Sequence, residues 1–163
     1  MDDLKLLTRD QLLTQLKDSI SMAEESIFIV GPWLDAYFTR IILDSLPSND
    51  IKVKFIVRVD DGIIDGKTLS ALNFARQNLS NFQTKSLENL HSKVILVDRE
   101  IFFLGSANWY WYSLNRGVEV TIKGHVNQLP ELISELDKYW EEGTPILEDL
   151  IGKYQDFEPV KVL

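Results

Sequence analysis

Short apolar strands alternate with amphipathic helices in the first half of the chain, and this order constrains the fold more than any other feature. Each apolar run before residue 80 is followed by a helical pattern, as in strand–helix–strand units with parallel strands. Beyond residue 90 three strands follow one another directly, which is typical of an antiparallel meander. We therefore expect an α/β fold, in which a mixed β-sheet carries helices on both faces.

The element boundaries come from apolar periodicity and from turn and capping residues. Thr8 and Gln11, for example, have the spacing of a capping box at the start of a helix. The predicted helices cover residues 9–24, 35–46, 68–79 and 129–142. The predicted strands cover residues 26–34, 51–60, 81–89 (a weak pattern), 91–98, 101–107 and 117–124. We interpret 1–163 as a single domain, in which 144–163 form a C-terminal tail with one short helix.

Composition excludes several classes of protein. The chain has 163 residues, no cysteine and a net charge of −8, so disulfides and thiolate metal sites are excluded. The acidic balance argues against coating nucleic acid by bulk charge, although a local basic cleft stays possible. Lys52, Lys54 and Arg58 form one short cationic stretch, which Asp60 and Asp61 follow, and we interpret it as a solvated strand edge.

The sequence also bears on where the protein works. It has no apolar run of about 18 residues, the length that a membrane-spanning helix needs. Its first residues lack the basic and then apolar layout of a signal peptide. We therefore expect a cytoplasmic protein.

Polar side chains gather at one end of the predicted strand 91–98. Alternate residues of a strand share a face, so His91 and Lys93 are expected to point the same way. If the strands 91–98 and 101–107 pair about a tight Arg99-Glu100 turn, Gly105 lies near Val94 and Asn108 lies near His91. Asn108, and Ser106 two residues before it, can then share the face of the histidine.

This cluster suits the chemistry of a phosphate. Lys93 supplies a positive charge, and Ser106 and Asn108 supply neutral donors for phosphoryl oxygens. His91 is the one conventional nucleophile in the cluster. Glu119, on the next predicted strand, could accept the proton of one ring nitrogen and fix the tautomer.

The same residues resemble the motif of a known family, the phospholipase D superfamily. The pattern H-x-K-x(4)-D is followed by G-S-x-N and then by an acidic residue four positions after an asparagine. Its members here are His91, Lys93, Asp98, Gly105, Ser106, Asn108, Asn115 and Glu119. The resemblance covers roughly residues 20–143, and the short chain with a single motif is similar to the small bacterial nucleases of the family.

The resemblance implies cleavage of phosphodiester bonds without metal or other cofactor, through a covalent phosphohistidine. Two such motifs normally meet at one active site, but this chain has one. His125 lacks the K-x(4)-D continuation and is interpreted as a turn or surface residue. The resemblance therefore implies a homodimer with two His91 side chains at the interface.

Individual roles follow from the resemblance. His91 is the nucleophile in one subunit and the general acid in the other. Lys93 and Asn108 hold the phosphoryl oxygens with help from Ser106, and Glu119 orients His91.

Three further residues complete the expectations for the site. Asp98 resembles the family aspartate and is expected to be structural, paired with a basic or backbone donor near the turn. Trp33 is a candidate for the cleft wall or the core. Trp109 begins a run of four aromatic residues, 109–112, that either lines the cleft or packs into the core and dimer interface.

The Asp-rich segment 60–66 is interpreted as a turn, because its spacing does not match a calcium loop, and we expect no metal. The substrate is expected to be nucleic acid, DNA or RNA, with a possible partner domain or protein that binds DNA. Two alternatives stay open: a non-catalytic ligand-sensing module of a regulatory protein, and a phospholipid phosphodiesterase.

Overall fold

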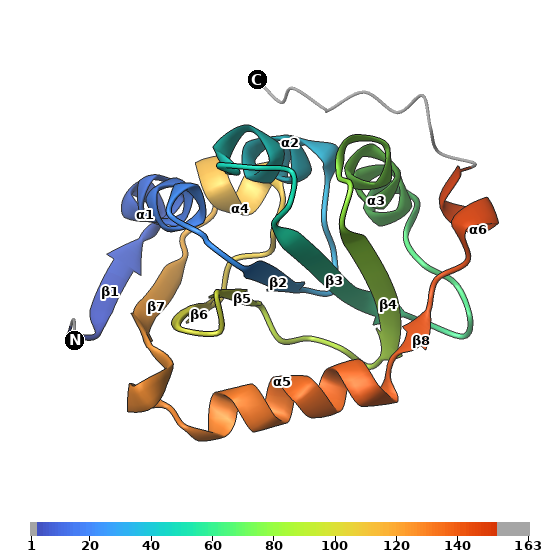
Figure 1. Ribbon diagram of the computed structural model, residues 1–163. Helices are drawn as coiled ribbons and strands as arrows, with labels where there is room; N and C mark the ends of the chain where they lie inside the picture. Colours follow the sequence, from blue (N-terminus) through green and yellow to red (C-terminus); the bar gives the residue numbers. More distant parts are fainter. Residues whose placement is uncertain (1–2, 153–163) are drawn as a thin grey trace.

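The computed structural model describes residues 3–152, which form a single mixed sheet of eight strands between helices. The strand order across the sheet is β1-β7-β6-β5-β2-β3-β4-β8 (Figure 1). The strands are β1 (Lys5–Thr8), β2 (Ser26–Val30), β3 (Lys52–Val59), β4 (Phe82–Glu88), β5 (Val94–Val97), β6 (Ile101–Gly105), β7 (Val120–His125) and β8 (Thr144–Pro145). β2, β3 and β4 are parallel, whereas the remaining neighbours are antiparallel.

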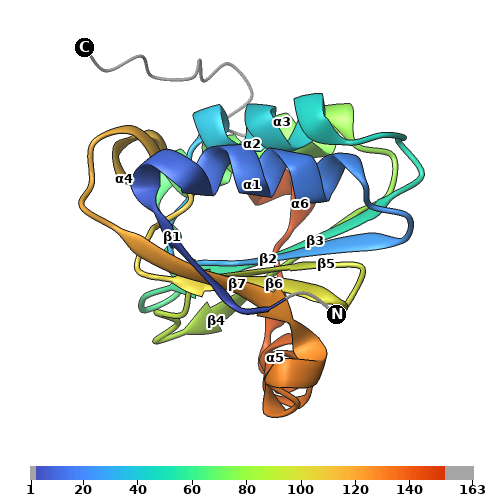
Figure 2. The same ribbon diagram turned by 90° about the vertical axis from the view of Figure 1, so that its left-hand side faces the viewer.

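The helices form two unequal layers. They are α1 (Arg9–Ser21), α2 (Ala36–Ser45), α3 (Gly66–Asn78), α4 (Trp111–Asn115), α5 (Glu131–Glu142) and α6 (Glu148–Gly152), with a 3-10 turn η1 (Val126–Gln128) before α5. α1 to α4 cover one face of the sheet, with α6 beside α3, and α5 alone crosses the other face (Figures 1 and 2). The predicted fold class is therefore confirmed.

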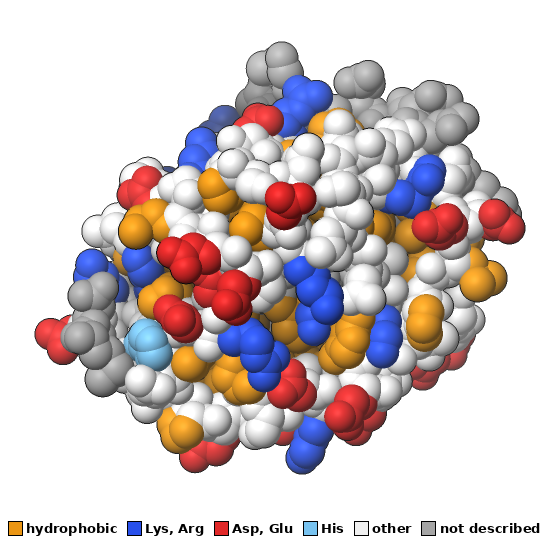
Figure 3. Space-filling model, viewed as in Figure 1, with side chains coloured by type: hydrophobic (Ala, Val, Ile, Leu, Met, Phe, Trp, Pro, Cys, Tyr) orange, Lys and Arg blue, Asp and Glu red, His pale blue; other side chains and the backbone are white. Residues whose placement is uncertain are grey.

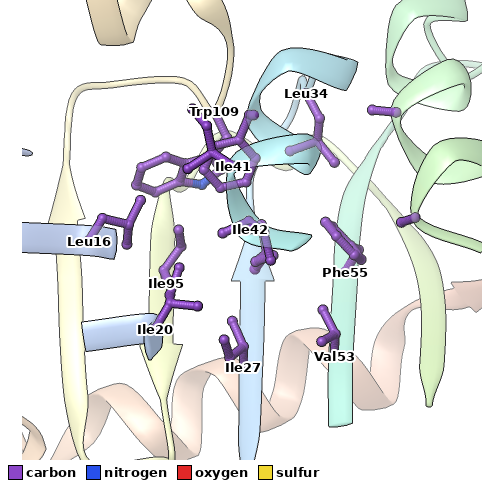
Figure 4. Close-up of a cluster of buried hydrophobic side chains, with 14 of the residues drawn as sticks. Leu16, Ile20, Ile27, Leu34, Ile41, Ile42, Val53, Phe55, Ile95 and Trp109 are labelled. Carbon is purple, nitrogen blue, oxygen red and sulfur yellow. The ribbon is translucent and has the colours of Figure 1, made fainter. Parts of the chain in front are cut away.

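Two apolar clusters hold these layers to the sheet. The larger cluster packs between the sheet and α1 to α3, and Figure 4 shows part of it, including Ile27, Phe55 and Ile95. The smaller cluster lies under α5, where Leu136 is buried against residues such as Phe28 and Phe102. Burial on both faces explains why the central strands read as nearly continuous apolar runs.

The predicted helices and strands are present, and the structure adds four short elements at their margins, namely β1, β8, α4 and η1. β1 pairs antiparallel with β7 and β8 pairs with β4, so each lies at an edge of the sheet. α4 begins at Trp111 and so contains the second half of the aromatic run 109–112. In the predicted tail, β8 and the short helix α6 lie within 144–152, and residues 153–163 lie outside the described residues.

The hairpin between β5 and β6 differs by one residue from the prediction. Leu104, not Gly105, lies opposite Val94. Asp98 and Arg99 are the central turn residues, with φ of 56° and 54°, the combination of signs that a type I′ turn requires. A shift of one residue exchanges the two faces of a strand, so this correction changes which residues accompany Lys93.

The cationic stretch on β3 is not a solvated edge, because β3 lies inside the sheet between β2 and β4. The Lys54 ammonium lies 4.8 Å from the ring centre of Phe28 and 4.6 Å from that of Trp140. The Arg58 guanidinium lies 5.9 Å from the ring centre of Trp33. Long basic side chains cover aromatic rings with their stems and charged ends, so an interior strand accommodates them.

Within the described residues, none of the helices combines the length and the apolar character needed to cross a membrane.

Candidate active site

His91 and Lys93 lie in contact where the chain enters β5. The Lys93 Nζ atom is 3.3 Å from Nδ1 and 3.5 Å from Nε2 of the His91 ring. The imidazole is exposed, whereas Lys93 is 9% exposed. The segment has no strand pairing until Val94, and Asn89 before it has a φ of 62°. The sequence thus places a basic pair at the open mouth of a buried strand.

The environment of Lys93 adjusts its charge. Burial lowers the pKa of its ammonium, and the negative charge of Glu119 acts in the opposite direction. An ammonium only donates hydrogen bonds, so the ring nitrogen that it meets must carry a lone pair. A hydrogen bond from Lys93 therefore needs a ring nitrogen of His91 without a proton, and such a nitrogen is also what a nucleophile uses.

Ser106 and Glu119 form the next part of the site. The Ser106 hydroxyl donates to Glu119 Oε1 at 2.8 Å, and the Ser106 N–H donates to the carbonyl of Val120 at 3.0 Å. The carboxylate expected to orient His91 is therefore bonded to the serine, and it reaches Lys93 through charge. Ser106 continues the pairing of β6 with β7, and this brings its hydroxyl to Glu119, which directly precedes β7.

Asn108 lies farther along the loop after β6. Its N–H donates to Ser113 Oγ at 3.1 Å, and its Nδ2 is 3.4 Å from the Tyr110 hydroxyl. Its Oδ1 is buried and has no hydrogen-bond partner among the described residues. Both Asn108 and His91 lie beyond the paired residues of β5 and β6, so the expected position of Asn108 near His91 stays a prediction.

Trp33 forms a wall of the site, as one of its two interpretations predicts. Its ring centre lies 6.3 Å from that of His91, and the two planes are nearly perpendicular at 88°. The ring is half-buried. Such an edge-to-face contact restrains the imidazole while leaving it exposed.

Trp109 does not line the site, which corrects its assignment as a substrate-contacting residue. Its side chain is 1% exposed and lies among the buried apolar side chains of Figure 4. Its ring stacks on that of Phe38 at 5.4 Å. Its indole N–H donates to the Val30 carbonyl at 2.9 Å, so the whole ring is buried without an unpaired donor. A Cβ at Gly31 would approach Trp109 Cδ1 to 2.6 Å, which explains the glycine there.

Asp98 lies at the opposite end of β5 from His91. Its carboxylate accepts hydrogen bonds from the N–H groups of Glu24, Glu25 and Ser26, at 2.8–3.2 Å. The expectation that it pairs with a backbone donor is confirmed. The motif aspartate thus fixes the chain that leads into β2.

Asp35 is a buried acid that the sequence analysis missed. Its Oδ1 accepts from the Phe38 N–H at 2.9 Å, and its Oδ2 accepts from the Trp111 N–H at 2.7 Å. Burial raises the pKa of this carboxyl, and the two N–H groups oppose that effect. Asp35 ties the start of α2 to the segment after Asn108, and its place before a helix was the available signal.

Two further interpretations agree with the structure. His125 begins η1, where its Nδ1 accepts from the Asn127 N–H at 3.1 Å, as expected for a turn residue. Asp60 and Ile63 bridge a tight turn in which Asp61 has a φ of 50°.

Across residues 3–152, no group of three or more His, Cys, Asp or Glu residues is placed to hold a metal ion.

Known proteins share this architecture. The chain is similar to NucT from Helicobacter pylori, with a TM-score of 0.74 and 23% identity over 88% of this chain and 99% of that one. It is also similar to Nuc from Salmonella typhimurium, a phospholipase D family member, with a TM-score of 0.70 and 15% identity over the same shares. TrmBL2, described as an archaeal chromatin protein with a novel mode of DNA binding, has a TM-score of 0.59 and 13% identity, over 89% of this chain and 55% of that one.

A search of curated proteins finds no match. The family model described as "Cardiolipin synthase, PLD-like domain" matches residues 16–142, which run from the second half of α1 to the end of α5. With the matching motif residues and the shared fold, this places the chain in the family of phospholipase D-like domains.

Proposed function

We propose that this protein is a metal-independent phosphodiesterase, specifically a nuclease, and that it works through a covalent phosphohistidine at His91. The observation that carries the proposal is the contact of the exposed imidazole with the largely buried Lys93 ammonium. A positive charge held beside a neutral imidazole favours both the approach of a phosphate and attack on it.

The reaction takes two displacements. A ring nitrogen of His91 attacks phosphorus, the bond to the leaving oxygen breaks, and that oxygen takes a proton from a general acid. Water then loses a proton to the same group and attacks the phosphohistidine, which frees the imidazole and the phosphate monoester. Lys93 offsets the charge on the phosphoryl oxygens in both steps, with Ser106 and Asn108 as further donors.

We propose that the general acid is a second imidazole and that a second copy of the chain supplies it. His125 is engaged in capping η1, so each chain has one histidine at the site. Leu6, Val120 and Ile122 are 66%, 53% and 42% exposed on the sheet face opposite α1, and we call them the edge patch. This apolar surface adjoins Glu119, and a twofold contact there would bury it close to the site.

Nucleic acid is the proposed substrate, in a single-domain enzyme that recognises it locally. On the face shown in Figure 3, acidic and basic side chains are interspersed, so broad electrostatic tracking of a duplex has no support. The shared fold with NucT and Nuc supports the assignment. A partner that binds DNA would reconcile the acidic charge with such a substrate.

A second candidate is a non-catalytic module that binds a phosphate-containing ligand at the same cluster. The fold shared with TrmBL2, a chromatin protein, favours this candidate. The sequence argues against this candidate, because all the motif residues with an expected catalytic role, from His91 to Glu119, are present. A phospholipid substrate would use the same chemistry and differ in the leaving group.

Hydrolysis in EDTA tests the proposal. Single-stranded DNA, a chromogenic phosphodiester and phospholipid micelles would be compared for the wild type, His91→Ala and the control His125→Ala. We expect cleavage of DNA that survives EDTA and His125→Ala and is lost in His91→Ala. Mass spectrometry after an acid-free quench should detect on His91 a phosphoryl group that still carries the remaining part of the DNA strand. A folded wild type that cleaves none of the three would favour the binding module.

Sedimentation of the wild type and of Ile122→Glu tests whether a second copy of the chain binds at the edge patch. We expect a dimer that the charged residue at the edge patch dissociates, with loss of activity. Leu147→Glu is the matched control, because Leu147 is 73% exposed on the opposite edge of the sheet. A fully active monomer would contradict the shared site.

A further inference from the structure

Arg58 lies beside the candidate site and is held at three points. Its Nε donates to both carboxylate oxygens of Asp60, at 2.9 and 3.0 Å. Its Nη1 donates to the Leu90 carbonyl at 3.4 Å, and the guanidinium carbon lies 5.9 Å from the centre of the Trp33 ring. One planar group thus connects the turn after β3, the aromatic wall and the chain before His91.

The charge of Arg58 is already balanced. Asp60 neutralises the guanidinium at hydrogen-bond distance, and the Asp60 side chain is the more exposed of the two, at 58% against 25%. A phosphate that approached from solvent would meet this carboxylate as well as the arginine. The pair therefore does not suit direct binding of a phosphate, and its contacts point to orientation instead.

His91 depends on the two elements that Arg58 contacts. No strand pairing holds its backbone, since β5 begins at Val94. The residue before it, Leu90, is 3% exposed and provides the buried anchor of the segment. Apart from Lys93, the neighbour that restrains the imidazole is the Trp33 ring. Arg58 touches both Trp33 and Leu90, so it can set the position of His91 without touching it.

We propose that Arg58, held by Asp60, is a positioning residue for His91 that acts through Trp33 and Leu90. The kinetic consequence rests on the proposed function, whereas the orientation of the ring does not. A displacement of a nucleophile by about 1 Å can cost on the order of 100-fold in rate. Loss of a support behind the nucleophile should therefore lower kcat and leave KM nearly unchanged.

The first test measures the ring itself by NMR of protein labelled at histidine. The chain has two histidines, so His125 serves as an internal reference. In Arg58→Ala, we expect the His91 ring signals to shift and broaden, because the ring current of Trp33 falls steeply with distance, while the His125 signals stay in place. Arg99→Ala is the matched control, since Arg99 also pairs with a carboxylate, that of Asp137, but lies at the other end of β5.

Unchanged His91 signals in Arg58→Ala would overturn the proposal, as would equal shifts in Arg99→Ala. Arg58→Lys provides a second, milder variant in case Arg58→Ala fails to fold. A lysine keeps the charge but cannot make the planar contacts together, so the His91 signals should still move. Wild-type signals in Arg58→Lys would show that charge alone matters and would also overturn the positioning role.

The second test separates positioning from binding. For DNA cleavage we expect kcat to fall about 10-fold in Arg58→Ala with KM within about 2-fold, and Asp60→Asn to give a smaller loss of the same kind. An Arg58→Ala variant that raised KM and kept kcat would contradict the proposal. If the wild type cleaves no phosphodiester, the proposed function fails, and the NMR result alone decides the role of Arg58.

Discussion

The two ends of β5 carry the two ends of one sequence motif, yet they are built in opposite ways. At the Asp98 end, the carboxylate accepts from three backbone N–H groups, and the neighbouring Arg99 makes a bidentate pair with Asp137 of α5. At the other end His91 is exposed, its segment is unpaired, and Lys93 meets it as a donor. One end satisfies its polar groups within the protein, and the other leaves them available.

This difference teaches how one strand serves both stability and chemistry. A filled set of hydrogen bonds fixes the strand against β2, so the opposite end can hold an exposed imidazole without losing its position. Substitutions at the two ends should therefore separate activity from stability. The following predictions test that separation, from the largest expected effect to the smallest.

His91→Ala should abolish catalysis and leave the fold intact. We expect a loss of at least about 1,000-fold in kcat, because the nucleophile is removed. The free energy of unfolding should change by less than about 0.5 kcal/mol, since the side chain is exposed. Chemical denaturation and DNA hydrolysis measure the two quantities. A strongly destabilised variant would contradict the expected difference between the His91 and Asp98 ends of β5.

Lys93→Met should lower kcat about 100-fold, because the charge beside the phosphoryl group is lost. Burial lowers the pKa of Lys93, so the ammonium of the wild type loses its proton at a pH below the ordinary 10.5. Activity should therefore fall on the alkaline side before that pH. An arginine at this position keeps its charge to higher pH, so Lys93→Arg should shift the alkaline limb of the pH–activity profile to higher pH. Identical alkaline limbs would argue against Lys93 as the charged group.

Asp98→Asn should show the reverse of His91→Ala. The amide keeps the size of the side chain and tolerates positive φ, but its NH2 group cannot accept from the N–H groups of residues 24–26. We expect unfolding to require about 2 kcal/mol less, with kcat per folded molecule unchanged. Thermal unfolding and active-site titration would measure these effects. A loss of kcat without a loss of stability would place Asp98 in the chemistry.

Asp137→Asn should produce the smallest effect, a loss of about 0.5 kcal/mol, because both partners of the pair with Arg99 are half-exposed. The pair lowers the pKa of Asp137 below 3.8. Its contribution is therefore present above the unfolded pKa and is lost as the pH falls through the lower folded value. Unfolding measured against pH should give a difference between wild type and variant that disappears in strong acid. A difference that persists there would point to packing instead of charge.

The comparison also indicates which parts of the site could be predicted. His91, Lys93 and Asp98 lie within eight residues of one strand and its ends, so spacing alone placed them. The positions of Ser106 and Asn108 depend on how two strands pair, and there the register differs from the prediction by one residue, since Leu104 lies opposite Val94. Asp98 lies in the turn instead of the strand, with a positive φ as at Arg99, and neither residue is the glycine that usually announces such a turn.

The sequence by itself determined the alternation of strands and helices, the mixed sheet and the local basic pair. Periodicity reports which face of an element is apolar, and that is enough to define the layers. Only the tertiary structure decided that Trp109 is core, that Glu119 bonds to Ser106 and that Arg58 contacts Trp33. These contacts join residues on different elements, and their geometry depends on register and packing, which local sequence patterns do not encode.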